Sequence, residues 1–366
     1  MSHLPLLGLR VLDLTRVLAG PLATMQLGDL GAHVLKVERP GAGDESRGWG
    51  PPFDDRGESA YYLCCNRNKL GMLADFANDD DVALIRRLAA SADVVIENFL
   101  PGALARRGLD AATLLAEYPR LVWCTIAGFA SEPSRPGYDY VVQAEAGWMS
   151  ITGEPSGDPM KAGVALADIL TGKETVGAVL AAVTGVRGGL TVDRHVTVSL
   201  YETAVGALMN VGQNVIATGA PARRFGNAHP NLVPYELFHT RTDPVVIAVG
   251  NDSQYSALTA VLGVPALADA RFANNAGRQA NRADVVGLIA GAMRGRECDE
   301  VLAAFRDAGV PAGRVRSVQQ ALATVQTSPL TGIAPQLPAQ VRRPPPRLGE
   351  HNALVREHGW EAFSRA

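Results

Sequence analysis

Two short apolar stretches near the start of the chain, joined by one helical segment, constrain the fold more than any other part of the sequence. Residues 10–15 and 33–38 have the composition of buried strands. Between them, residues 16–20 are predicted as a loop, and Pro21 suits the first turn of a helix that ends at residues 28–31. This βαβ unit predicts a parallel, doubly wound, Rossmann-like α/β sheet with a ligand at the carboxyl ends of its strands.

The strand pattern continues through the first half of the chain, but it lacks a dinucleotide fingerprint. Further strands are predicted at residues 68–73, 94–99, 121–126 and 195–200. A dinucleotide site needs a G-x-G-x-x-G turn after the first strand, whereas residues 17–21 contain a single glycine. The sequence therefore argues against an NAD site and leaves open a nucleotide bound in another way.

The length of the chain predicts more than one domain. A chain of 366 residues exceeds what one hydrophobic core usually serves, and its 47% hydrophobic residues supply apolar material for two. Residues 219–230 are rich in turn-forming residues and form the clearest linker. A strand at residues 245–249 and helices at 254–262, 282–293 and 299–308 indicate a second domain.

The charge of the chain argues against two classes of partner. The formal net charge is -3, and the longest basic runs are pairs of arginines. A nucleic acid or an anionic membrane surface needs a basic face. We therefore expect neither as a partner, whereas local anion sites are compatible with the arginine pairs.

The cysteines and the N-terminus indicate a cytoplasmic protein. Cys64, Cys65, Cys124 and Cys298 form neither a C-x-x-C motif nor a disulfide framework, so we expect reduced, mostly buried thiols. The N-terminus lacks the basic and apolar regions of a signal peptide, and charged side chains interrupt the longest apolar stretch, residues 164–186. We expect no signal peptide and no membrane span.

Asp168 is a single acidic residue within an apolar, small-residue stretch, residues 162–172, at the predicted start of a helix. Asp is favoured as a helix N-cap, because its oxygen accepts a free backbone N–H of the first turn. With a free pKa near ~3.9 the carboxylate is also ionised at neutral pH, and in a dry pocket it can attack an acyl carbon. The two roles are compatible, since a helix N-terminus stabilises an anion.

Taken together, these landmarks resemble the family III CoA-transferases, the group that contains formyl-CoA transferase and carnitine CoA-transferase. Each matching segment is short, and the set is specific through its order and spacing. The segments are residues 8–15, 19–21, 30–32, 36–44, 97–99, 101–102, 163–172 and 348–351.

The resemblance implies a fold and an oligomer. It implies a large domain built from both ends of the chain, residues 1–200 and 320–366, a linker at 201–230 and a small α+β middle domain at 231–319. Two such chains would form an interlocked homodimer.

The resemblance also implies a chemistry. Asp168 matches the family's nucleophile, which forms aspartyl anhydride and aspartyl-CoA thioester intermediates while CoA passes from an acyl-CoA donor, for example succinyl-CoA, to a free carboxylic acid. The residues that match CoA-binding positions are Leu18, Ala19, Arg39, Asn98, Phe99, Arg106 and Arg107. A lysine that binds CoA in the formyl enzyme corresponds to Pro136 here, so that contact is absent or replaced. No metal is implied.

Two other functions compete with CoA transfer. The related 2-methylacyl-CoA racemases use a histidine and an aspartate as acid–base pair, and their histidine corresponds to Tyr138, beside Asp139. A tyrosine with a pKa near ~10 is a poor base at neutral pH, which favours a transferase. Asp139 matches an acidic residue near the active site of the formyl enzyme. The second alternative is a nucleotide-binding module without catalysis.

The acceptor acid is not identified by the sequence. Arg224 and His229, in the predicted linker, are candidates for contacting a dicarboxylate such as succinate. Paired arginines or a single histidine beside a proline turn are more often structural, and substitution of Arg224 by alanine would separate the two roles.

Overall fold

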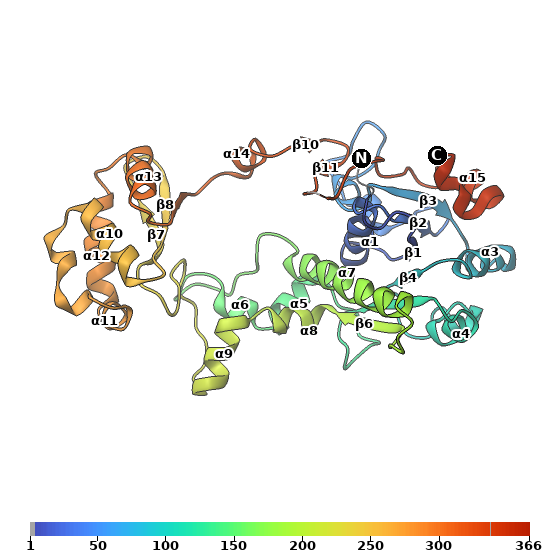
Figure 1. Cartoon of the computed structure of the whole chain (residues 1–366), viewed down its shortest axis with the longest axis horizontal. Coiled ribbons are helices and arrows are strands. Elements are labelled where there is room, and N and C mark those ends of the chain that lie inside the picture. Colours follow the sequence, from blue (N-terminus) through green and yellow to red (C-terminus); the bar gives the residue numbers. More distant parts are fainter. Residues whose placement is uncertain (1–3, 337) are drawn as a thin grey trace. The chain divides into compact units, whose positions relative to one another are not determined.

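The computed structural model describes residues 4–336 and 338–366 and divides into two compact units. The described part of the first unit lies within Met1–Trp148, Lys161–Met209 and Val325–Ala366, and the second unit comprises Met149–Met160 and Asn210–Thr324. The first unit therefore combines the blue beginning and the red end of the chain in Figure 1.

A six-stranded parallel sheet forms the centre of the first unit, as the βαβ pattern predicts. Its order is β3-β2-β1-β4-β5-β6, the order of nucleotide-binding α/β folds. Successive strands are added on one side of β1 up to β3 and on its other side from β4 onward. This reversal of strand order places a ligand crevice outside the carboxyl ends of β1 and β4. The strands are β1 (Arg10–Leu14), β2 (His33–Glu38), β3 (Lys69–Leu73), β4 (Val94–Glu97), β5 (Val122–Ala127) and β6 (His195–Ser199).

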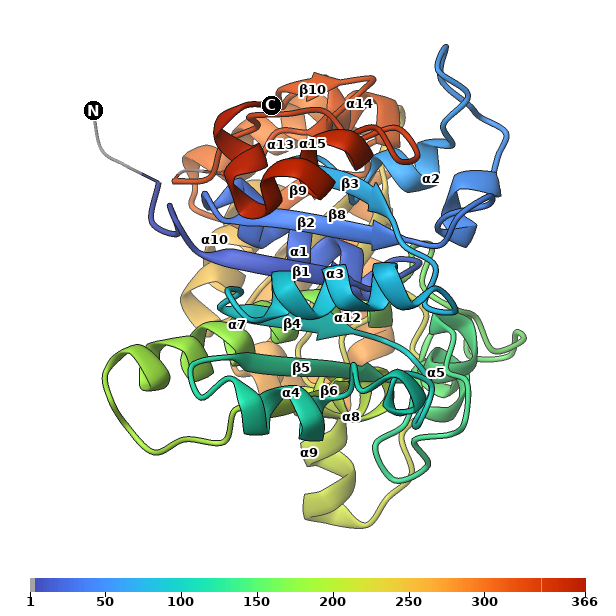
Figure 2. The ribbon, with the colours of Figure 1, turned by 90° about the vertical axis from the view of Figure 1, so that its right-hand side faces the viewer.

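Helices cover both faces of this sheet because successive strand residues point in opposite directions. Val11 packs with one buried cluster, formed with α1 (Ala19–Asp29) and α7 (Leu166–Arg187). Leu12 packs with the other, formed with α3 (Asp79–Ala89), α4 (Ala111–Glu117) and α15 (Asn352–His358). Figure 2 shows α3 and α4 in front of β1, β4 and β5. Apolar residues on both faces of a strand are typical of a parallel sheet.

Short elements connect these layers. They are η1 (Glu45–Gly48), α2 (Ala60–Leu63), η2 (Ala105–Arg107), α5 (Asp139–Glu145), α6 (Trp148–Ile151), α8 (Leu200–Gly206), the small hairpin β10 (Thr327–Ser328) and β11 (Gly332–Ile333), and η5 (Gly359–Ser364). All four cysteines are free, and three of them are buried, whereas Cys64 is exposed.

The long helix α7 is a core helix of the first unit. By length and composition alone it would also pass as a membrane-spanning segment. However, Ala167, Val179, Ala182 and Val183 are buried in the cluster beneath the sheet. Gly172 lets α7 approach α1 closely, since a Cβ there would lie 2.8 Å from the carbonyl oxygen of Ala19.

The second unit has an antiparallel sheet of three strands, β7 (Tyr235–His239), β8 (Pro244–Ala248) and β9 (Ala312–Arg314). Helices α10 (Asp252–Leu262), α12 (Arg282–Met293) and α13 (Cys298–Asp307) pack with it around one core. The remaining elements of this part of the chain are α9 (Met209–Thr218), η3 (Pro265–Ala268), η4 (Ala270–Phe272), α11 (Asn275–Ala280) and α14 (Val318–Leu322).

The predicted linker at residues 201–230 contains helical structure in its first part. Most of α8 and all of α9 lie within residues 201–218, and residues 219–230 are without helix or strand.

Candidate active site

A cavity of about 820 Å³ opens at the carboxyl ends of β1, β4 and β5, where the strand order reverses. Leu18 and Ala19 reach it from the loop after β1, and Asn98 and Phe99 from the loop after β4. Tyr138 and Asp168 line it as well. The structure therefore brings six of the predicted site residues to one cavity.

Asn98 ties the two loops that border the reversal point. Its side-chain Oδ1 accepts a hydrogen bond from the Arg16 backbone N–H at 3.1 Å, and its Nδ2 donates to the Arg16 carbonyl oxygen at 2.9 Å. A side-chain amide can satisfy both groups of one peptide residue at once, which a carboxylate cannot do. Asn98 thus positions the loop after β1 in addition to lining the cavity.

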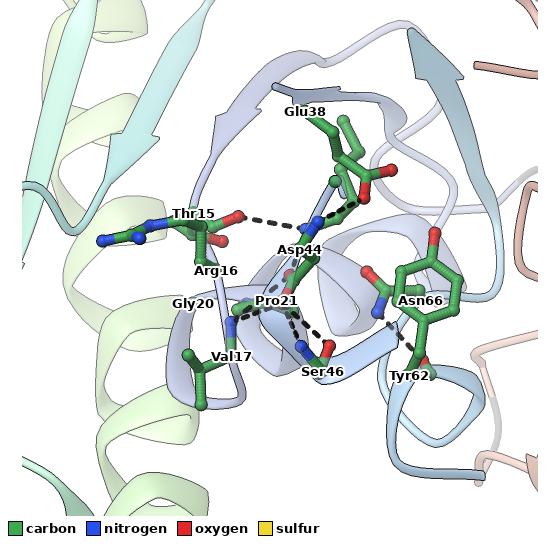
Figure 3. Close-up of polar contacts among 12 residues, drawn as sticks. Thr15, Arg16, Val17, Gly20, Pro21, Glu38, Asp44, Ser46, Tyr62 and Asn66 are labelled. Atoms are coloured by element: carbon green, nitrogen blue, oxygen red, sulfur yellow. Dashed lines mark hydrogen bonds and ion pairs between the residues drawn. The ribbon is translucent and has the colours of Figure 1, made fainter. Parts of the chain in front are cut away.

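Val17, in the same loop, has a left-handed backbone conformation with φ of 73°. A β-branched residue adopts this conformation only when its surroundings impose it. Here the Asp44 carboxylate accepts a hydrogen bond from the Val17 N–H, at 3.2 Å to Oδ1, and Ser46 N–H donates to the same oxygen at 3.0 Å. Figure 3 shows these bonds converging on Asp44.

The charge of Asp44 is compensated by the buried Lys36. The Lys36 Nζ donates to Asp44 Oδ2 at 2.9 Å and to the Thr15 carbonyl oxygen at 3.0 Å. Burial alone would raise the pKa of Asp44, but the Lys36 ammonium and the Ser46 donors lower it to about 2. Asp44 and Arg47, two polar residues of the segment 41–57, are both buried here in ion pairs.

Asp168 occupies the third position of α7 and does not cap it. The N-cap is Ala165, which has no side-chain hydrogen bond, so the predicted capping role is wrong. The Asp139 Oδ1 instead accepts hydrogen bonds from the backbone N–H groups of Ala167, at 2.8 Å, and Asp168, at 3.3 Å. A carboxylate from another helix therefore replaces the local cap.

Asp139 is itself held in place by Gln143, one turn along α5. The Gln143 Nε2 donates to Asp139 Oδ2 at 2.6 Å, and its Oε1 accepts from the Ala162 N–H at 2.8 Å. This arrangement joins α5 to the segment before α7. It leaves the Asp168 side chain free of any structural hydrogen bond.

The Asp168 carboxyl group is buried and unpaired. Its residue is 8% exposed, and no side chain or backbone donor in residues 4–336 and 338–366 forms a hydrogen bond with it. Burial, together with the nearby Asp139 charge, raises the pKa of Asp168 to about 7. The expectation of full ionisation at neutral pH is therefore corrected, because near pH 7 the protonated and ionised forms coexist.

The small residues around Asp168 serve two different purposes. Ala167 is fully buried in the core, so its small size serves packing and not ligand access. Gly163, by contrast, borders free space, since a Cβ added there would meet no other atom within 4 Å.

Arg16 lines the cavity and was not among the predicted site residues. Its Nη1 pairs with Glu45 Oε1 at 2.6 Å, and its guanidinium lies 5.4 Å from the centre of the Phe99 ring. The Arg16 Nε and the Glu45 Oε2 are buried without a hydrogen-bond partner among the described residues. The signal that could have identified Arg16 is its position directly after the first strand.

A second buried carboxylate, Glu97, also borders the cavity. It accepts hydrogen bonds from Thr125 Oγ1 at 2.6 Å and from the Phe99 N–H at 2.7 Å. Burial raises the pKa of Glu97. Its hydrogen bonds are internal, so Asp168 is the buried cavity carboxylate without such bonds in the described chain.

The predicted CoA-binding arginines lie outside this lining. Arg39 is exposed at the end of β2 and donates from Nε to the Gly43 carbonyl oxygen at 3.1 Å. Arg106 and Arg107 are exposed in η2, after β4, and Arg107 pairs with Asp79 at 3.3 Å. Their role in CoA binding stays a prediction.

Arg224 and His229 belong to the second unit and make local contacts there. The Arg224 Nε donates to the Glu154 carbonyl oxygen at 2.9 Å, and its Nη2 to that of Gly157 at 2.6 Å. The His229 Nδ1 accepts from the Asn231 N–H at 3.0 Å. These contacts are those of structural residues, and the carboxylate-binding role stays untested.

Comparison with known proteins identifies the family. CoA-transferase family III matches residues 6–352. A succinate–glutarate CoA-transferase of Agrobacterium fabrum is 41% identical over 96% of this chain and 94% of its own, and a human succinyl-CoA:glutarate CoA-transferase is 37% identical over 96% and 85%. A CAIB/BAIF family protein from Brucella suis has a TM-score of 0.83 and 39% identity, covering 97% of this chain and 99% of its own. The chain thus belongs to CoA-transferase family III and is a CoA-transferase.

Proposed function

We propose that Asp168 is the nucleophile of this CoA-transferase. Its ionised carboxylate attacks the acyl carbon of the donor thioester, giving an aspartyl–acyl anhydride and CoA thiolate. The thiolate attacks the aspartyl carbonyl, which releases the donor acid and leaves an aspartyl-CoA thioester. The acceptor carboxylate then attacks this thioester, and the returning thiolate takes up the acceptor acyl group and restores the Asp168 carboxylate.

The observation that carries this proposal is the free carboxyl group of Asp168 in the cavity. Nucleophilic attack needs a carboxylate that is not held by donors, and no described residue binds this one. Burial makes the anion poorly solvated, and the N-terminal turn of α7 supplies a favourable dipole for it. Asp139, by contrast, is fixed by backbone and Gln143 donors and is suited to positioning.

CoA would enter this cavity from the carboxyl ends of the strands. We propose that its pantetheine arm passes Leu18, Ala19 and Phe99, since these apolar residues line the cavity. The exposed Arg39 and Arg106 are available for phosphate groups outside it, because their guanidinium groups have no carboxylate partner in the described chain.

We further propose succinyl-CoA as donor and a dicarboxylic acid of the glutarate type as acceptor. The relatives named above act on succinate and glutarate. A second carboxylate on the substrate needs a cation at the cavity, and Arg16 supplies one whose Nη1 pairs with Glu45 and whose Nε has no partner among the described residues. Arg16 is a better candidate for this contact than Arg224, whose guanidinium already binds carbonyl oxygens.

Trapping with hydroxylamine tests the nucleophile. The enzyme is incubated with succinyl-CoA and then hydroxylamine, and the modified peptide is identified by mass spectrometry. We expect a hydroxamate on Asp168 in the wild-type enzyme, no hydroxamate in Asp168→Asn, and a retained one in the Asp139→Asn control. Absence of any adduct, together with loss of α-deuterium from a 2-methylacyl-CoA, would instead support a racemase.

We also propose that the enzyme acts as an interlocked homodimer in the cytoplasm. Helix α9 supports the oligomer, since none of its fully described residues is buried, and Met209 and Ile216 are 74% and 78% exposed. Apolar side chains exposed to this degree on one helix are typical of a protein–protein contact. The free cysteines are compatible with a reducing compartment.

A further inference from the structure

A second cavity, of about 730 Å³, lies at the opposite end of the large sheet from Asp168. His33, the first residue of β2, and Lys69, the first residue of β3, line it together with Arg342, Arg343 and His351. The amino ends of these parallel strands face away from the ligand crevice at the carboxyl ends. This cavity is therefore separate from the candidate active site.

Hydrogen bonds from the backbone N–H groups of the two arginines hold them at the cavity. Asn68 Oδ1 accepts hydrogen bonds from the N–H groups of Arg342, at 2.6 Å, and Arg343, at 2.9 Å. The Arg342 Nη2 donates to the carbonyl oxygens of Gly28, at 2.7 Å, and Ala32, at 2.9 Å. The Arg342 Nε is buried and has no partner among the described residues, so one donor of this fixed guanidinium is unused.

Two histidines, His33 and His351, also line the cavity. The His351 Nδ1 accepts a hydrogen bond from the Gly71 N–H at 3.2 Å, so in the neutral ring the proton is on Nε2. The His33 ring is stacked on Phe363, with ring centres 4.6 Å apart, which fixes its plane. The neutral His351 ring therefore has an Nε2–H to present to a ligand, and His33 lines the same cavity.

The guanidinium groups of Arg342 and Arg343 donate to carbonyl oxygens, those of Gly28, Ala32, Phe363 and Ala366, and to no side-chain carboxylate among the described residues. Burial and the neighbouring arginines lower the pKa of His33, and burial lowers the pKa of Arg342 and Arg343. The Lys69 ammonium is already bound by Asp13 and Asn66. On the negative side, the Glu350 carboxylate lines the cavity and accepts from the Arg347 N–H, and the Ala366 oxygen accepts from Arg343 Nη2 at 3.0 Å.

We propose that this cavity binds a phosphate group, either free phosphate or the phosphate of a nucleotide. Guanidinium groups bind phosphate oxygens through paired N–H donors, and Arg342 and Arg343 are adjacent and already oriented. The His351 Nε2–H and the unpartnered Arg342 Nε supply further donors. The volume exceeds what inorganic phosphate requires and is within the range of small-molecule sites.

Equilibrium dialysis of the full-length enzyme with radiolabelled inorganic phosphate tests this site, and ADP is titrated in parallel. Arg342→Gln removes the charged donor. His351→Asn keeps an acceptor for the Gly71 N–H and removes the Nε2 donor. The control Arg87→Ala removes an exposed arginine of α3 elsewhere on the same unit. CoA-transferase kcat/KM is measured for every variant.

We expect saturable binding to the wild-type and Arg87→Ala proteins, weakened about tenfold or more in both cavity variants, with kcat/KM unchanged. Tighter binding of ADP than of phosphate, weakened by the same variants, identifies a nucleotide phosphate, and the reverse order identifies the free anion. If Arg342→Gln fails to fold, His351→Asn decides alone. Binding that both cavity variants retain, or no saturable binding at millimolar phosphate, overturns the proposal.

Discussion

The protonation state of Asp168 sets the pH range in which the proposed nucleophile can act. Its pKa is raised to about 7 by burial and by the Asp139 charge, and the reactive form is the carboxylate. We therefore predict that kcat/KM for the acyl-CoA donor rises with pH through about 7. Below that pH it should fall roughly tenfold per unit, because each unit reduces the ionised fraction tenfold.

The variant Asp139→Asn provides the matched test of this pH profile. It removes the neighbouring charge and keeps an oxygen that can accept from the Ala167 N–H. We expect the inflection in kcat/KM to move to lower pH. A profile that is flat between pH 5 and 8 in the wild-type enzyme would contradict an ionisable Asp168 nucleophile.

Arg16 is the residue through which the acid's second carboxylate should be recognised. We predict that Arg16→Gln raises KM for glutarate about tenfold or more, because a hydrogen bond between charged groups contributes about 1.5–3 kcal/mol. KM for butyrate, which has a single carboxylate, should change much less. Arg224→Gln is the control and should affect the two acids alike. Equal increases for both acids in Arg16→Gln would exclude the carboxylate contact.

The structure shows which features a sequence pattern can predict at this scale and which it cannot. Val11 and Leu12 are both apolar because β1 is covered on both faces, so the strand is visible locally. The cap of α7 is not visible in the local sequence, because Asp139 lies 28 residues before Ala167 in the chain. The pairing of Arg16 with Glu45 and the ion pairs of Asp44 likewise depend on tertiary packing.

Among the elements of the fold, the loop after β1 depends on a buried ion pair. Lys36 and Asp44 are both fully buried, and together they bind the Thr15 carbonyl and the Val17 N–H. We predict that Lys36→Met destabilises the protein by about 3–5 kcal/mol, because it leaves the Asp44 charge buried and unpaired. Urea unfolding measures this change.

A surface pair provides the control for Lys36→Met. Arg86 and Glu117 form an ion pair whose side chains are 30% and 41% exposed. Glu117→Gln should change the free energy of unfolding by no more than about 1 kcal/mol, since exposed pairs contribute little. A similar loss in both variants would mean that burial of the Lys36–Asp44 pair is not what stabilises the loop.

At the scale of the whole molecule, α9 is a helix that exposes large apolar side chains in a single chain. Ile216 is 78% exposed, although an isoleucine gains about 1.5–3 kcal/mol on full burial. If a second copy of the chain covers α9, a charge at this position must be desolvated in the contact. We predict that Ile216→Glu shifts the enzyme from dimer to monomer in sedimentation velocity, with unchanged secondary structure by circular dichroism.

Leu190 provides the control, since it is 67% exposed in the turn after α7. Leu190→Glu adds the same charge and should leave the dimer intact. In the proposed interlocked dimer, the two chains cannot separate unless one of the chains opens. Ile216→Glu should therefore act mainly during assembly. Refolding from urea should therefore yield monomers of this variant more completely than dilution of a folded sample. A wild-type protein that sediments as a monomer would contradict the dimer itself.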